Sequence, residues 1–201
     1  MKQLRTVEDV MTHAVISVDR RAPFKEIVEA MRQWRISALP VLSEEGRVAG
    51  VVSEADLLLK AQGADESRAV SAGQLMTVPA VTVTKDATIP GAARLMARGH
   101  LKRLPVVDGD GRLVGVVSRG DLLKIYLRPD ADIAEELRRL IMAELIPVGS
   151  AMVLVHVADG IVQLDGSIPD PALKDVLVRV ARTVPGVVDV TAVRLDTEVR
   201  A

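Results

Sequence analysis

The sequence repeats itself without a gap, at a fixed offset of 65 residues, over roughly its first 125 residues. Two copies are too few for a solenoid. Two copies of an incomplete unit usually pair face to face about a pseudo-twofold axis, which places equivalent residues around a shared cleft. We therefore expect the functional site between the copies. The repeated blocks are Met11-Thr12 and Met76-Thr77, Leu39-Pro40-Val41 and Leu104-Pro105-Val106, and Gly50-Val51-Val52-Ser53 with Asp56 and Gly115-Val116-Val117-Ser118 with Asp121.

Composition indicates a globular protein. Its 201 residues, 49% of them hydrophobic, can bury a proper core. No apolar run approaches the length of a spanning helix, and the first residues have no apolar stretch typical of a signal peptide, so we expect a cytoplasmic protein. The sequence has no cysteine, which excludes disulfides and thiolate metal sites. One Phe, one Trp, one Tyr and a net charge of -1 argue against nucleic-acid binding.

Apolar periodicity predicts the order β-α-β-β-α in each copy. The chain then divides into a first motif at residues 1–62, a linker at 63–74, a second motif at 75–128 and a separate domain at 129–201. The predicted elements are strand 14–18, helix 27–34, strands 38–42 and 47–52 and helix 53–60 in the first copy, and strand 80–84, helix 89–97, strands 103–107 and 112–117 and helix 118–127 in the second.

After Pro129 the pattern changes to a helical stripe that runs from Ile133 to Leu145 and ends before Pro147. Strands are expected at 151–157 and 161–164, joined by a tight turn at 158–160. A helix at 172–184 and a strand at 186–195 complete the order α-β-β-α-β. The whole chain is therefore predicted to be an α/β (α+β) protein with two pseudo-twofold-related motifs and a small third domain.

The repeated Ser-x-x-Asp motif stands where a strand ends and a helix begins. Serine before the first turn, with an acid three residues later, is close to a capping box, and this structural interpretation is favoured for the motif taken alone. A functional interpretation is compatible with it, because serine can hydrogen-bond an anion and a carboxylate can bind the two hydroxyls of a ribose. The residues concerned are Ser53 and Asp56 in the first copy and Ser118 and Asp121 in the second.

These blocks resemble the cystathionine-β-synthase (CBS) domain family, and two tandem copies resemble the CBS pair, also called a Bateman module. The resemblance covers residues 7–127. It implies two clefts that bind adenosine-containing ligands such as AMP, ADP, ATP or S-adenosylmethionine, and a homodimer of flat shape. An adenosine nucleotide would then be a regulatory ligand, and no cofactor would be required.

The resemblance also implies which residues line the clefts. In the first cleft, Thr12 and Ile16 would lie beside the base or ribose, Ser53 and Asp56 on the ribose, and Lys102 and Arg103 toward phosphate. In the second, Thr77, Val81, Ser118 and Asp121 would take the equivalent places, with Ser37 and Ala38 facing the phosphates. Adenine would pack between aliphatic side chains such as Ile16 and Val52.

The two predicted clefts differ in charge, since Lys102 and Arg103 correspond to the uncharged Ser37 and Ala38. Charge-assisted hydrogen bonds are roughly twice as strong as neutral ones. We therefore expect the Asp56 cleft to favour phosphorylated nucleotides. The Asp121 cleft should bind a less charged adenosine compound, bind weakly or stay empty. Without the family argument, Lys102 and Arg103 could equally belong to a solvated turn.

The tail resembles the BON family, small α/β modules named for bacterial osmotic-shock and nodulation proteins. The resemblance rests on Asp159-Gly160-x-Val162-x-Leu164-x-Gly166 and on Val184-Pro185-Gly186-Val187-x-x-Val190. It implies phospholipid binding, but residues 129–201 carry 12 acidic and 7 basic side chains, which opposes attraction to anionic membranes. A contact with a partner protein is the preferred role.

No catalytic or metal-binding constellation stands out in the sequence. His13, His100 and His156 are far apart, and no phosphate loop or nucleophile elbow is present. The chain is accordingly predicted to be a non-catalytic regulatory protein that senses an adenosine compound and signals through dimerisation or the BON-like tail. The alternatives are a structural adaptor with vestigial clefts and a membrane-associated BON protein.

Overall fold

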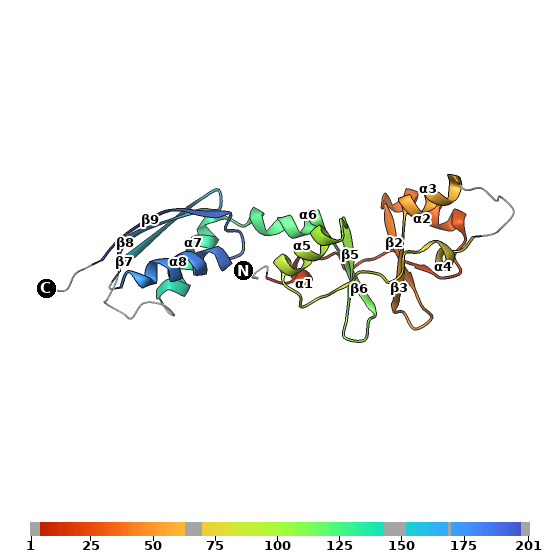
Figure 1. Cartoon of the computed structure of the whole chain (residues 1–201), viewed down its shortest axis with the longest axis horizontal. Coiled ribbons are helices and arrows are strands. Elements are labelled where there is room, and N and C mark those ends of the chain that lie inside the picture. The colour runs from red at the N-terminus through yellow and green to blue at the C-terminus, as the bar shows by residue number, and fades with distance from the viewer. Residues whose placement is uncertain (1–4, 63–69, 143–151, 169, 198–201) are drawn as a thin grey trace. The chain divides into compact units, whose positions relative to one another are not determined.

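The computed structural model describes residues 5–62, 70–142, 152–168 and 170–197 in two compact units (Figure 1). The first unit spans residues 5–122 and holds both copies of the repeat. The second contains the described residues from Leu123 onward. The mixed helices and sheets confirm the predicted fold class, and the order of elements after Pro129 is the predicted α-β-β-α-β.

The first unit repeats one set of elements. The first copy consists of α1 (Val7–Val10), β1 (Val18–Asp19), α2 (Phe24–Trp34), β2 (Ala38–Leu42), β3 (Val48–Ser53) and α3 (Glu54–Gln62). The second consists of α4 (Ala72–Leu75), β4 (Val83–Thr84), α5 (Ile89–Arg98), β5 (Arg103–Val107), β6 (Leu113–Ser118) and α6 (Arg119–Leu122).

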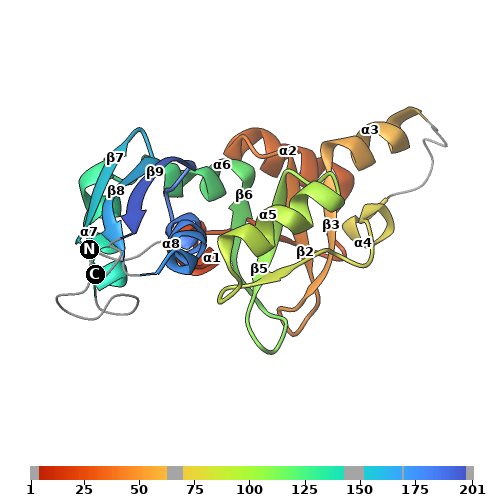
Figure 2. The ribbon, with the colours of Figure 1, turned by 60° about the vertical axis from the view of Figure 1, so that its left-hand side comes forward.

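Each copy forms one three-stranded sheet. In the first sheet β2 lies between β1 and β3, pairing parallel with β1 and antiparallel with β3, and β4, β5 and β6 repeat this arrangement. The register repeats as well, since Ala38 pairs with Ser53 and Arg103 pairs with Ser118. The hairpins β2–β3 and β5–β6 lie side by side in both views (Figure 1 and Figure 2).

The bridges that join the copies obey a twofold relation, because shifting both partners by the repeat offset converts one bridge into another. This reciprocity is the signature of the expected pseudo-twofold axis. The bridges are Thr12 with Val116 and its counterpart Val51 with Thr77, Thr6 with Thr88 and its counterpart Pro23 with Ser71, and Arg47 with its own counterpart Arg112.

The first helix of each copy packs against the other copy. In α1, the backbone N–H of Val7 donates to the carbonyl oxygen of Ala87 at 2.9 Å. In α4, the backbone N–H of Ala72 donates in the same way to Ala22 at 2.9 Å, and Ala72 is buried in the core of the first copy. The Met-Thr dipeptide that follows each of these helices is therefore delivered to the opposite copy.

This exchange explains a repeated glycine. A Cβ atom built on Gly50 would lie 2.6 Å from the sulfur of Met76 and 2.9 Å from the carbonyl oxygen of Thr77. On Gly115 it would lie 2.7 Å from the sulfur of Met11. Only glycine allows the Met-Thr segment of one copy to approach the strand of the other this closely.

Several predicted boundaries are wrong. The strands expected at 14–18 and 80–84 shrink to β1 and β4, because β1 pairs with β2 at only two residue pairs and β4 pairs with β5 at only two. The helix expected at 118–127 changes after Leu122 into the 3₁₀-helix η1 (Leu123–Leu127). Residues 72–74 of the predicted linker belong to α4. The prediction at Leu145 lies outside the described residues.

The second unit is a sheet with two helices. After η1 come α7 (Asp130–Leu140), β7 (Met152–Ala158), β8 (Ile161–Ile168), α8 (Ala172–Thr183) and β9 (Asp189–Thr197). β8 lies between an antiparallel β7 and a parallel β9. Asp159 and Gly160 have φ values of 51° and 72° in the expected turn, and the Asp130 carboxylate accepts hydrogen bonds from both of their backbone N–H groups at 2.8 Å.

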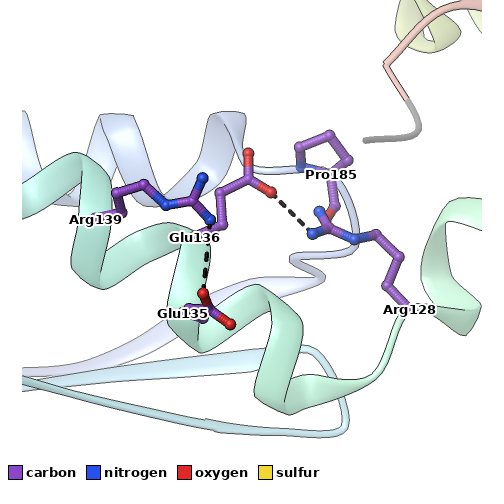
Figure 3. A network of polar contacts seen from close by, with 5 residues as sticks. All are labelled: Arg128, Glu135, Glu136, Arg139 and Pro185. Carbon is purple, nitrogen blue, oxygen red and sulfur yellow. Dashed lines mark hydrogen bonds and ion pairs between the residues drawn. The ribbon is translucent and has the colours of Figure 1, made fainter. Parts of the chain in front are cut away.

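A buried ion pair fixes the start of the second unit (Figure 3). The Arg128 guanidinium donates to the Glu136 carboxylate at 2.8 Å and to the carbonyl oxygen of Pro185 at 2.6 Å. The two side chains are only 11% and 4% exposed. Arg128 therefore holds η1, α7 and the loop before β9 together.

Among the described residues, no helix is both long and apolar enough to cross a membrane.

Candidate functional site

Two clefts lie between the copies within the first unit. The larger has a volume of about 420 Å³ and contains Asp56, and the smaller, about 330 Å³, contains Asp121. We call them the Asp56 cleft and the Asp121 cleft. The Asp56 cleft is lined by Ser37, Ala38, Val51, Ser53, Glu54, Ala55, Asp56, Thr77, Pro79, Ala80, Val81, His100, Leu101, Lys102, Arg103 and Pro105. The Asp121 cleft is lined by Thr12, Ala14, Val15, Ile16, Trp34, Ile36, Ala38, Pro40, Arg103, Val116, Ser118 and Asp121.

The two clefts are related by the repeat. Every residue that lines the Asp121 cleft, except Trp34, has its counterpart at the 65-residue offset in the Asp56 cleft. The counterpart of Trp34 is Gly99. The clefts are thus one site built twice, and the side chains that differ between them determine how their chemistry differs.

The Ser-x-x-Asp motif forms the predicted capping box in both copies. Asp56 accepts hydrogen bonds from the Ser53 backbone N–H at 2.8 Å and from the Ser53 hydroxyl at 2.6 Å. Asp121 accepts the same two bonds from Ser118, at 2.9 and 2.6 Å. Both bonds go to one carboxylate oxygen, Oδ2. Capping and lining of a cleft therefore coexist at both positions.

The predicted grouping of the threonine segments is wrong. Thr77 and Val81 line the Asp56 cleft, and Thr12 and Ile16 line the Asp121 cleft. The Thr77 hydroxyl donates a hydrogen bond to Oδ1 of Asp56 at 3.4 Å. The physical reason is the exchange of first helices, since the segment after α4 bridges to Val51 on β3.

Val52 is also misplaced in the prediction. It is fully buried in the core of the first copy, whereas its neighbour Val51 faces the Asp56 cleft. Alternate side chains of a strand point to opposite faces, so only one of two adjacent valines can face the cleft. The aliphatic walls of the Asp56 cleft include Val51 and Val81, and those of the Asp121 cleft include Ile16 and Val116.

The basic side chains gather at the Asp56 cleft. Lys102 and Arg103 line it as expected, and His100 lies beside them. Ser37, predicted in the other cleft, lines this one and accepts a hydrogen bond from the Arg103 guanidinium at 3.2 Å. Ala38 lines both clefts. A phosphate here would meet two cations at the start of β5.

Trp34 and His100 are cleft residues that sequence reasoning missed. Trp34 continues the helical stripe of Ile27 and Met31, which predicts a core position, yet its side chain is 53% exposed. Trp34 lies shortly before Ser37 and Ala38, and His100 shortly before Lys102 and Arg103. Because both residues lie within a few positions of the predicted phosphate-facing residues, the sequence could have indicated that they line the clefts. No group of three metal-ligating side chains was found among the described residues.

The chain belongs to the CBS domain family. The CBS domain model matches residues 7–63 and 72–128, more than half of the sequence. The BON domain model matches residues 129–197. The predicted combination of a CBS pair and a BON domain is thereby confirmed.

Three known proteins are similar to the CBS pair. The CBS domain-containing protein YhcV of Bacillus subtilis is 34% identical over 121 residues, which cover 59% of this chain and 84% of YhcV. The structure of CBSX2 from Arabidopsis thaliana in complex with AMP is 30% identical and has a TM-score of 0.55, covering 61% of this chain and 96% of that one. The cytosolic domain of the Mg²⁺ channel MgtE in complex with ATP is 29% identical with a TM-score of 0.54, covering 61% and 49%.

Proposed function

We propose that this protein is a non-catalytic regulator that senses an adenosine-containing ligand through its CBS pair. The observation that carries the proposal is the Asp56 cleft, where a carboxylate, an aliphatic wall and two basic side chains share one cavity. These groups match the ribose, the base and the phosphates of a nucleotide. The similarity to AMP-bound CBSX2 and to the ATP-bound MgtE domain supports the same ligand class.

The proposed contacts follow the geometry of the cleft. Oδ2 of Asp56 is engaged by Ser53, so Oδ1, together with the Thr77 hydroxyl beside it, would receive the ribose hydroxyls. Val51 and Val81 would hold adenine between them, and Lys102 with Arg103 would bind phosphate. AMP, ADP and ATP are the proposed ligands of this cleft.

The Asp121 cleft would bind a less charged adenosine compound. Among its lining residues Arg103 is the basic one, while Trp34 offers the large face of an indole ring, which the other cleft lacks. An uncharged nucleoside or S-adenosylmethionine suits such a site better than a polyphosphate, because stacking on an aromatic ring requires no countercharge.

The transmission of the signal is proposed to be a shift between conformations. A ligand that contacts both copies stabilises one arrangement of them, and the coupling cannot exceed its difference in affinity for the two. A homodimer or a protein bound to the BON domain would receive this change. Leu58 and Leu59 on α3 are 63% and 70% exposed and offer apolar surface for a dimer. Sedimentation velocity of Leu59→Glu beside the wild type tests this, because a charge in the dimer interface should shift the protein toward the monomer.

The test compares Asp56→Ala with Asp121→Ala. Both variants lose the same capping box, at about 1 kcal/mol each, so their melting temperatures should fall by similar small amounts. Calorimetric titration with AMP should show loss of tight binding only in Asp56→Ala.

Two other results would decide for the alternatives. Equal AMP binding in both variants and in the wild type would assign the Ser-x-x-Asp motif to capping alone. Absence of AMP binding in the wild type as well would favour the adaptor with vestigial clefts. Flotation of the protein with phosphatidylserine vesicles would favour the membrane-associated alternative, because the acidic residues 129–201 should be repelled by an anionic membrane.

A further inference from the structure

Arg103 stands in the wall that the two clefts share. It lines both the Asp56 cleft and the Asp121 cleft, and so does its repeat counterpart, Ala38. Since Ala38 has no charge, the shared wall offers a single guanidinium to two sites. The pseudo-twofold symmetry of the clefts is broken at the position where they meet.

The guanidinium is directed to one of the two sites. It donates to the Ser37 hydroxyl at 3.2 Å, and Ser37 lines only the Asp56 cleft. The Asp56 cleft also has Lys102, which does not line the other cleft. Among the lining residues of the Asp121 cleft, Arg103 is the basic side chain and Asp121 the carboxylate.

We infer that Arg103 makes the two clefts compete for phosphate. A phosphorylated nucleotide in the Asp56 cleft would hold the guanidinium there and weaken the binding of a second phosphorylated ligand in the Asp121 cleft. An uncharged adenosine compound in the Asp121 cleft is unaffected. Full occupancy then means one phosphorylated and one uncharged ligand. This inference rests on the proposed function, because it takes both clefts as adenosine sites.

The competition depends on where the positive charge of Arg103 lies. A phosphate group carries about -1.5 to -2 at pH 7, and in the Asp121 cleft it would face a carboxylate once Arg103 is engaged elsewhere. By linkage, the weakening is reciprocal between the sites. Allosteric couplings typically span about 5- to 150-fold in affinity, and we expect about tenfold here.

The structure supplies a reporter for the test. Trp34 is the only tryptophan of the chain and lines only the Asp121 cleft. Its fluorescence, titrated with AMP and separately with adenosine, therefore measures occupancy of that cleft. The Asp56 cleft is emptied by Asp56→Ala, and Asp56→Asn serves as a second variant whose amide oxygen still accepts from Ser53.

The expected result has three parts. Emptying the Asp56 cleft should tighten the Trp34-reported affinity for AMP about tenfold, while the affinity for adenosine stays the same. The tightening should vanish in the Arg103→Ala background, where the shared cation is absent. It should persist in the control Lys25→Ala, because Lys25 is an exposed basic residue that lines neither cleft.

An unchanged Trp34-reported affinity for AMP after emptying the Asp56 cleft would overturn the inference. Calorimetry on the same samples separates this result from failure of the proposed function. Tight AMP binding that depends on Asp56 leaves the sensor proposal standing, whereas no AMP binding in either cleft removes both.

Discussion

At the scale of single residues, the repeat preserves contacts more than it preserves chemistry. Gly50 and Gly115 are identical because each receives the Met-Thr segment of the other copy. Ser53 and Ser118 are identical because each caps a helix with its aspartate. The phosphate-facing positions of the clefts differ between the copies, since Lys102 corresponds to Ser37 and Arg103 to Ala38. The copies are alike where they pack together and at the cleft residues Asp56 and Asp121, and unlike at the phosphate-facing positions.

The close approach at Gly50 leads to a stability prediction. A methyl group there would meet the backbone oxygen of Thr77 at 2.9 Å, which cannot move as a side chain can. Gly50→Ala should lower the free energy of unfolding by about 1–3 kcal/mol, measured by urea denaturation. Gly109→Ala is the matched control, because nothing lies within 4 Å of its added methyl group. Equal stability of the two variants would contradict the packing described.

At the scale of elements, regular strands and amphipathic helices were predictable and the pairing of the copies was not. The predicted strands at 38–42 and 103–107 match β2 and β5, because apolar runs bounded by turns specify short strands. A repeat identifies equivalent residues but does not say which copy they face. Thr12 and Thr77 were therefore assigned to the wrong clefts, and in β3 the cleft wall was assigned to Val52 instead of its neighbour Val51.

The end of the second copy shows a different limit. The repeat predicts that residues 118–127 form the same continuous helix as α3, but η1 interrupts it. The residues that follow belong to the second unit, where Arg128 contacts Glu136 and the carbonyl oxygen of Pro185. This network joins residues far apart in sequence, so neither periodicity nor the repeat could have revealed it.

The same network gives a prediction for Glu136→Gln. Removing one charge of a buried ion pair leaves the other uncompensated and typically costs about 3–5 kcal/mol. Hydrogen exchange in the full chain should therefore accelerate strongly in α7 and in residues 184–187. The matched control is Glu135→Gln, whose ion pair with Arg139 spans 4.0 Å and has side chains 75% and 65% exposed (Figure 3). That variant should exchange as the wild type does, because exposed helical pairs contribute about 0.5 kcal/mol or less.

Unchanged exchange in Glu136→Gln would mean that Arg128 does not hold η1 and α7 together. Exchange that accelerates equally in Glu135→Gln would also contradict the account, because it would assign the effect to loss of negative charge on α7 rather than to the buried contact.

At the scale of the whole molecule, charge divides the chain in two. Residues 1–128 carry 19 basic and 15 acidic side chains, whereas residues 129–201 carry 7 and 12. The basic excess belongs to the CBS pair, where the proposed ligands are anions. The acidic excess belongs to the BON domain and is the reason we propose a protein rather than an anionic membrane as its partner.

The central claim is that phosphorylated adenosine ligands bind through Lys102 and Arg103. Its most direct test is calorimetric titration of the nucleotide-free protein with AMP, ADP, ATP, S-adenosylmethionine and adenosine, run beside Lys102→Ala/Arg103→Ala. The account predicts saturable binding in the wild type. In the double variant, affinity for the phosphorylated ligands should fall by about tenfold or more, as expected for lost hydrogen bonds to charged groups. The affinity for adenosine should stay the same. Absence of binding by every ligand, or equal weakening of AMP and adenosine, would contradict it.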